Sequence, residues 1–178
     1  MADKVKVVQR HQFADYLNVA AEGEADDFRL MDTGFTTLNE SPSAQTESKK
    51  YVNEKSTTTT ITSYETQFPF ESDLISDQEC ITTLYGIARN HLVGAEAQRE
   101  YVRVELWNPI QGETNKFTAR KFTVSVEVSE VSGETDMNVN GNLNAVGDPI
   151  DGVFDTQTLK FTAPTTINSS ILFVGGQH

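Results

Sequence analysis

The chain is poor in the residues that most often form redox, metal and nucleophilic sites. It has 178 residues, with one cysteine and three histidines. A single cysteine excludes an intrachain disulfide, and we expect Cys80 to be a buried, reduced thiol in a helix. His11, His91 and His178 lie far apart, without the spacing of metal ligands. Phosphate-binding glycine loops, nucleophile elbows and Cys-x-x-Cys pairs are also missing. We therefore predict no catalytic residue, no cofactor, no metal and no enzyme activity.

Basic residues are scarce as well, with 14 Lys and Arg against 26 Asp and Glu and a net charge of −12. A protein that grips nucleic acid needs clusters of basic side chains that release counterions from phosphates. The charge therefore argues against tight DNA binding, although DNA can still slide past such a surface. No apolar run approaches the roughly 18 residues of a membrane-spanning helix, and the N-terminus has no apolar signal core. We expect no membrane anchor and no export signal.

Alternation of apolar and polar residues is the main pattern that the chain does have. It is typical of strands with one buried face, and it recurs in the second half with turns between. The segments that show it are 102–106, 122–128, 137–145 and 159–163. Gly147-Asp-Pro149 predicts a turn, and Val131, which falls out of phase, predicts a bulge or a strand end.

One helix is expected, over residues 77–92. Ser76 is a good N-cap, Glu79 completes a capping box, and Gly94 is a natural stop. Apolar residues recur at helical spacing, so the helix has one stripe for a sheet to cover. The fold class is therefore mainly β: a single-domain antiparallel sandwich or barrel with one flanking helix.

The stretch before this helix divides into a polar part and a strand-forming part. Residues 39–56 are almost entirely polar and predict a long loop, which is usually functional or disordered. Residues 58–70 predict one long strand, in which Tyr64, Phe68 and Phe70 share a face. Pro69 has no N–H and marks a strand end or an edge.

Both ends of the chain are predicted to be extensions of the domain. Residues 1–27 are interpreted as an N-terminal arm and residues 165–178 as a C-terminal tail. The tail contains an uncharged, β-prone run that either closes its own sheet or adds to the exposed edge of a neighbour. The residues of this candidate edge contact are Ile171, Leu172, Phe173 and Val174.

One fragment, Asp136-Met-Asn-Val-Asn-Gly141, matches the opening of a calcium-binding EF-hand loop. Its twelfth position should be Glu but is Gly147, and no flanking helices are predicted. The same residues fit a strand, which is the interpretation we adopt.

A series of short segments between residues 8 and 164 follows the order of one protein family. The segments are GFTTLNESP at 34–42, the stretch 44–55, YETQFPF at 64–70, ISD at 75–77, LY at 84–85, RN at 89–90, YVRVELW at 101–107, GDP at 147–149 with Gly152 and Phe154-Asp155, and 159–162. In this ordered series the chain resembles the major tail protein, or tail tube protein, of long-tailed bacteriophages and of related prophages of Gram-positive bacteria.

The resemblance implies two packed sheets, one flanking helix and long arms. It also implies hexameric rings that stack head to tail into a hollow tube, through which genome DNA enters the host. The tape measure, tail terminator and distal tail proteins would be partners in the virion, after synthesis in the bacterial cytoplasm. No enzyme activity belongs to the family.

A tube of this kind needs an inner wall along which DNA slides. An acidic or neutral polar face repels phosphates, whereas a basic face would hold them. Two predicted strands have such a face, although an ordinary solvated outer face would have the same composition. The candidate lumen-facing residues are Thr59, Ser63, Glu65, Gln67, Ser125, Glu127 and Ser129.

The polar segment 39–56 is the candidate contact between stacked rings. In a free subunit we expect it to be flexible, and to become ordered when a partner surface offsets the loss of entropy. Its charges of both signs suit matching patches on a neighbour. They belong to Glu47, Lys49, Lys50, Glu54 and Lys55.

The alternative is a monomeric β-sandwich module that binds a ligand such as carbohydrate. Such a module needs exposed aromatic side chains in a groove. Tyr101 and Trp107 share one face of a predicted strand and fit that role. Packing against the helix or a neighbour would explain both residues equally well.

Overall fold

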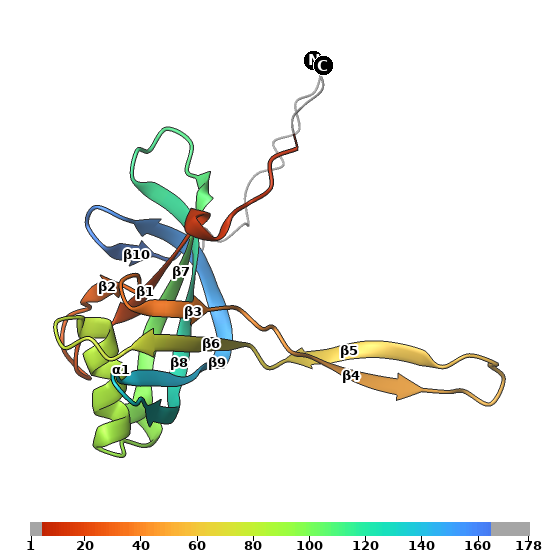
Figure 1. Cartoon of the computed structure of the whole chain (residues 1–178). Coiled ribbons are helices and arrows are strands. Elements are labelled where there is room, and N and C mark those ends of the chain that lie inside the picture. Colours follow the sequence, from red (N-terminus) through yellow and green to blue (C-terminus); the bar gives the residue numbers. More distant parts are fainter. Residues whose placement is uncertain (1–4, 165–178) are drawn as a thin grey trace, which may run out of the picture.

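One antiparallel sheet of eight strands forms the body of the protein (Figure 1). The computed structural model describes residues 5–164. The strands lie in the order β2-β1-β7-β8-β9-β6-β3, with β10 beside β9. Their bounds are Phe13–Asn18 (β1), Phe28–Leu30 (β2), Phe35–Leu38 (β3), Gln67–Asp73 (β6), Gln98–Pro109 (β7), Lys116–Ser132 (β8), Asn138–Asp155 (β9) and Lys160–Thr162 (β10).

The sheet curls because its two longest strands, β8 and β9, pair with different strands along their length. β9 pairs with β8 throughout, with β6 at one end and with β10 at the other. The result is a half-barrel, covered by the helix α1 (Glu79–Arg89) and by the short 3₁₀ turn η2 (Gly94–Ala97). The predicted mainly β, antiparallel fold with one flanking helix is confirmed for the described residues.

Two apolar cores lie on opposite faces of the central strands. Tyr101, Phe68 and Phe122 pack with Leu84 of α1 on the inner face of the curl. Val102 and its neighbours pack on the other face, against β2 and β10. Alternation along β7 therefore fails as a guide to exposure, and Arg103, expected to point outward, is only 6% exposed.

The helix is shorter than the predicted 77–92, and its ends differ from those expected. Gln78 is the N-cap and makes no side-chain cap bond. The Glu79 carboxylate lies 3.1 Å from Arg29 Nε, so it takes part in an ion pair rather than a capping box. At the other end, His91 adopts a positive φ of 51° and its N–H bonds to the carbonyl of Ala88. A Schellman-type end at His91, and not Gly94, therefore stops the helix.

The prediction of a long loop over residues 39–56 is corrected in its middle. Ala44–Lys49 forms a strand, β4, which pairs with β5 (Thr58–Tyr64) as a separate two-stranded sheet. The single strand predicted over 58–70 is likewise two strands, because the chain leaves the hairpin after Tyr64 and enters the main sheet at Gln67. Phe68 and Phe70 are buried as expected, but Tyr64 is 61% exposed.

Pro69 lies inside β6, opposite Asn142 of β9, and does not end the strand. Its carbonyl accepts the N–H of Asn39, immediately after β3 has ended at Leu38. In an antiparallel pair the N–H and C=O of one residue point to the same side. The missing N–H therefore faces Asn39, just beyond the end of β3, and the return bond to the Asn39 carbonyl is the one bond that proline removes.

The predicted N-terminal arm, 1–27, is wrong for much of its length. β1 lies inside the sheet, between β2 and β7, and Leu17 is fully buried. The short 3₁₀ turn η1 (Arg10–Gln12) precedes it. The C-terminal tail, with Ile171, Leu172, Phe173 and Val174, lies outside the described residues.

The turn predicted at Gly147-Asp-Pro149 is a bulge within β9. Thr123 pairs with Val146 and Lys121 with Ile150, so the three residues between them bow out of the ladder. The out-of-phase position of Val131 has the predicted cause, because the register of β8 against β9 shifts between Val128 and Glu130.

Candidate functional site

The hairpin of β4 and β5 projects away from the body of the protein (Figure 1). Every residue of both strands is exposed. An isolated two-stranded hairpin is marginally stable in water, because it has no core of its own. Its direction must therefore be fixed at its root, and its free surface is available to a partner.

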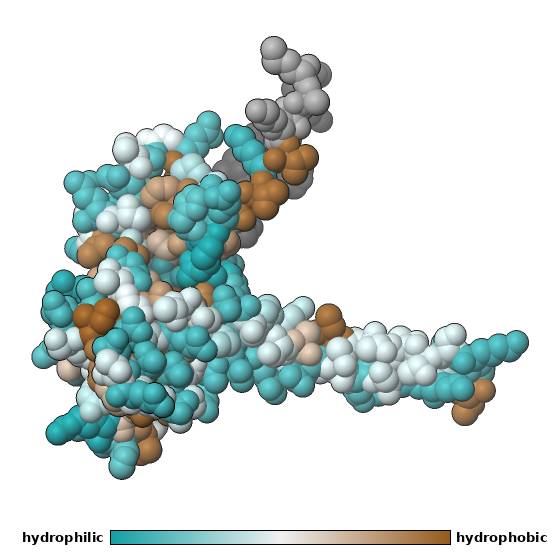
Figure 2. Space-filling view, viewed as in Figure 1, coloured by the Kyte–Doolittle hydropathy of each residue, from teal (hydrophilic) through white to brown (hydrophobic). Residues whose placement is uncertain are grey.

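Five predicted stacking residues lie together on this hairpin. Glu47 and Lys49 lie within the last three residues of β4, and their side chains form an ion pair at 3.3 Å. Lys50, Glu54 and Lys55 follow in the turn. Figure 2 shows the hairpin as intermediate to hydrophilic, with one hydrophobic spot partway along it and another near its outer end. The exposed apolar side chains of this turn are Tyr51 and Val52.

Two predicted lumen residues, Thr59 and Ser63, also lie on the hairpin, but on opposite faces. A register shift at Thr62 separates them, since Gln45 faces Ser63 whereas Thr46 faces Ile61. Thr59 pairs with Ser48, on the face that also carries Ile61 and Tyr64. The expected shared polar face is therefore wrong for this pair, and the bulge is the reason.

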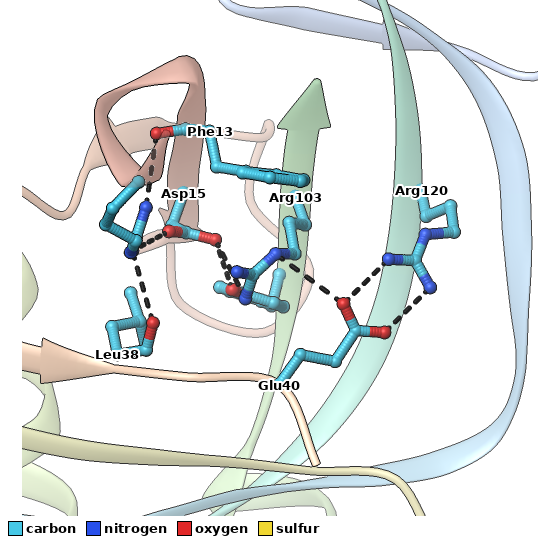
Figure 3. A network of polar contacts seen from close by, with 8 residues as sticks. Phe13, Asp15, Leu38, Glu40, Arg103 and Arg120 are labelled. Carbon is cyan, nitrogen blue, oxygen red and sulfur yellow. Dashed lines mark hydrogen bonds and ion pairs between the residues drawn. The ribbon is translucent and has the colours of Figure 1, made fainter. Parts of the chain in front are cut away.

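A partly buried polar network holds the root of the hairpin (Figure 3). Glu40, in the connection from β3 to β4, accepts two hydrogen bonds of 2.8 Å from the guanidinium of Arg120 on β8. The same carboxylate lies 3.6 Å from Arg103 Nε on β7. The bond to Glu40 raises the pKa of Arg120. Two strands of the body thus fix the point where the hairpin begins.

The network continues to Asp15 of β1. Arg10 Nη2 donates to Asp15 at 2.6 Å and to the carbonyl of Leu38 at 3.2 Å, which ties η1 to the end of β3. Tyr101 donates its hydroxyl to the same carboxylate, and burial together with the charge of Asp15 raises the Tyr101 pKa. Arg103 Nη1 lies 3.7 Å from Asp15. Its guanidinium therefore sits between two carboxylates, those of Asp15 and Glu40.

This network could not be predicted from the sequence. Arg103 is one of several polar residues alternating with valines, and nothing in the local pattern separates a buried one from an exposed one. Glu40 lies in the polar segment that was interpreted as a loop. The contacts depend on sheet order, which brings residues 10, 15, 40, 103 and 120 together.

Four other predicted lumen residues cluster around the outer surface of the sheet. Gln67 and Ser125 both pair with Asn144, and Glu127 pairs with Asn142. Glu65 lies beside them, at the exit from the hairpin. The seventh candidate, Ser129, is the extra residue of the β8 bulge, and its hydroxyl donates to the carbonyl of Asn140. This surface is acidic or neutral, since residues 67–73, 123–132 and 138–144 include no Lys or Arg.

A groove of about 640 Å³ lies between the hairpin root and this sheet. Pro42, Tyr64 and Pro149 give it apolar walls, and Phe122 contributes to it from the core. Carboxylates also line it, those of Glu40, Glu65, Glu127 and Asp148. Within the described part of the chain, Glu40 is the one of these four that has a basic partner.

The aromatic pair proposed for a ligand-binding module is not exposed as a pair. Tyr101 is fully buried against Phe68 and Phe122. Trp107 is 42% exposed and makes an edge contact with Phe13 at 6.5 Å between ring centroids. These two residues cannot form a common surface for a sugar ring.

Comparison with protein-family models gives no match, and no curated protein sequence matches the chain. Across residues 5–164, no three His, Cys, Asp or Glu side chains are grouped so that they would hold a metal ion. No helix in that range has the length and apolar character needed to cross a membrane. The structural features on which a functional proposal can rest are therefore the hairpin, the polar network at its root and the acidic sheet surface.

Proposed function

We propose that the chain is a structural tail tube protein, whose hexameric rings stack head to tail into the conduit for phage DNA. The observation that carries this proposal is the projecting hairpin. It buries nothing within its own chain, yet a polar network holds its root to the body. A fixed, uncovered arm suits a subunit that gains its partner on assembly.

The acidic sheet surface supports the same proposal. Glu71, Asp73, Glu127 and Glu130 lie along β6 and β8, with asparagines of β9 between them. Phosphates repelled by such a wall have no counterion release to hold them, so DNA passes without specific binding. Tape measure, terminator and distal tail proteins would contact the ends and interior of the same tube.

Dependence of particle size on protein concentration tests the proposal. The purified full chain is examined by size-exclusion chromatography with light scattering over a hundredfold range of concentration. A tube protein passes from subunits to large particles as the concentration rises. A chain that elutes as a monomer throughout would favour the binding-module alternative.

A further inference from the structure

We infer that the hairpin tip of one copy, residues 49–55, docks in the groove at the hairpin root of a second copy. The inference rests on the proposed function and deepens it, because it names the surface that receives the hairpin. The tip and the groove differ in charge and each has exposed apolar groups, so their chemistry is complementary.

The tip is a basic and apolar element in an acidic chain. Residues 49–55 contain three lysines and one glutamate, whereas the whole chain has a net charge of −12. Tyr51 is 57% exposed and Val52 is 109% exposed, so neither side chain is covered by its own copy. Lys50 and Lys55 form no ion pair within residues 5–164, in contrast to Lys49, which pairs with Glu47.

The groove has the opposite charge and a matching apolar lining. Glu65, Glu127 and Asp148 have no basic partner among the described residues, while Arg120 is held by Glu40. Tyr64 is 61% exposed beside them. Lys50 and Lys55 of an incoming tip would find carboxylates here, and Tyr51 and Val52 would be covered by the apolar walls. Opposite charges brought together in a partly dry groove favour this pairing over others.

A second groove, beside Arg10, is a weaker candidate. It is lined by Leu30, Phe35 and Leu106, and so has a more apolar wall. Its charges nearly cancel, because Arg10 pairs with Asp15 at 2.6 Å. Asp32 is the one carboxylate of its lining without a basic partner among the described residues, against three in the groove at the hairpin root. Charge therefore favours the groove at the hairpin root.

The position of the two elements gives the contact a direction. The groove lies at one end of the hairpin and the tip at the other, so the contact joins two different surfaces of the same chain. Such a head-to-tail contact either closes into a ring or repeats along an axis, depending on the rotation between successive copies. In the proposed stack of rings it repeats along the axis of the tube. β4 has 6 residues and β5 has 7. At about 3.3 Å per residue, the paired strands set tip and groove roughly 20 Å apart, with the turn adding to this distance.

Disulfide crosslinking between two differently tagged full-length variants tests the contact. Val52→Cys places a thiol on the tip and Asp148→Cys places one at the groove. The native Cys80 does not compete, because burial raises its pKa to about 12. Mixed under oxidising conditions, the two variants should form a disulfide-linked heterodimer. Glu134→Cys, exposed and outside the groove, replaces Asp148→Cys as the matched control and should give none.

Exchanging the charges of the tip and the groove provides an independent test of the contact. Lys50→Glu with Lys55→Glu should raise the protein concentration needed for assembly at least about tenfold, and adding Asp148→Lys and Glu65→Lys should restore most of the loss. Lys160→Glu is the matched control for the tip and should leave assembly unchanged.

The outcomes separate this contact from the proposed function. Tubes that form without the heterodimer would overturn the contact and leave the tube proposal standing. A heterodimer without tubes would support the contact and overturn the tube proposal. The absence of both products would overturn both.

Discussion

Removing the Glu40 carboxylate should destabilise the subunit more than removal of an ordinary surface carboxylate. In the Glu40→Gln variant, Arg120 loses its bidentate partner, with two bonds of 2.8 Å, and Arg103 loses a carboxylate 3.6 Å away. The side chains of Glu40 and Arg120 are 20% and 29% exposed, and that of Arg103 is 7% exposed. Arg103 would therefore keep its charge in a site that water reaches poorly.

The size of the effect follows from this burial. Breaking a fully buried ion pair costs about 3–5 kcal/mol, because the remaining charge is uncompensated. Glu40 and Arg120 retain part of their hydration, so we expect a smaller loss, about 2–3 kcal/mol in the free energy of unfolding. For a chain of this size, that loss lowers the Tm by roughly 5–10 °C.

Urea denaturation of dilute, unassembled protein measures this free energy. Glu113→Gln is the matched control, because Glu113 pairs with Lys116 at 3.2 Å and both side chains are at least 40% exposed. That variant should lose no more than about 0.5 kcal/mol. Coupling of Glu40→Gln with Arg120→Met in a double-mutant cycle should exceed 1 kcal/mol by a rough estimate. If Glu40→Gln costs no more than Glu113→Gln, the network does not hold the hairpin root.

Four further predictions concern separate parts of the molecule. Replacing Ala44–Tyr64 by a two-residue Asn-Gly turn should leave a folded monomer, seen by circular dichroism, that forms no tubes, because the flanking residues already pair across the hairpin. Charge reversal of Glu71 and Glu130 to Lys should leave tubes intact but slow DNA release in an ejection assay; release at the normal rate would contradict the lumen assignment. Gly141→Ala should lower the free energy of unfolding by roughly 2–4 kcal/mol in urea titrations, since its Cβ would lie 2.0 Å from the carbonyl oxygen of Glu127. Hydrogen bonds from the backbone N–H groups of Thr158 and Gln157 lower the pKa of Asp155 below its ordinary value of 3.8. The carboxylate therefore stabilises the β9–β10 turn above that pH, and this stabilisation is lost as the pH falls through the lowered pKa. In thermal melts, an Asp155→Asn variant should lack this loss of stability at acid pH.

The fold class could be predicted from the sequence because alternation and one amphipathic stripe are local patterns. Val124, Val126 and Leu143 alternate with polar residues and are buried, and Leu84 lies on the buried side of the helix. Strand ends were harder to predict. β8 begins six residues before the predicted alternation, because its first apolar residues, Phe117 and Ala119, belong to the second core. Phe122 and Val124 belong to the other core, on the opposite face, so the apolar positions change from odd to even along the strand.

The candidate site could be predicted only in part, for a related reason. The stacking residues share a short stretch of chain, so their proximity on the hairpin follows from the sequence. The polar network at the hairpin root does not follow from the sequence. Its residues come together only through the order of the strands in the sheet; they are Asp15, Glu40, Arg103 and Arg120. Strict alternation along a strand predicts that Thr59 and Ser63 share a face. One extra residue in β5 shifts the register between them and places them on opposite faces.

Negative-stain electron microscopy of the purified full-length chain at high concentration tests the central claim most directly. The account predicts long, hollow tubes of uniform diameter, built from stacked rings with sixfold symmetry. Fields that contain only separate, compact particles at concentrations where the protein is folded would contradict it.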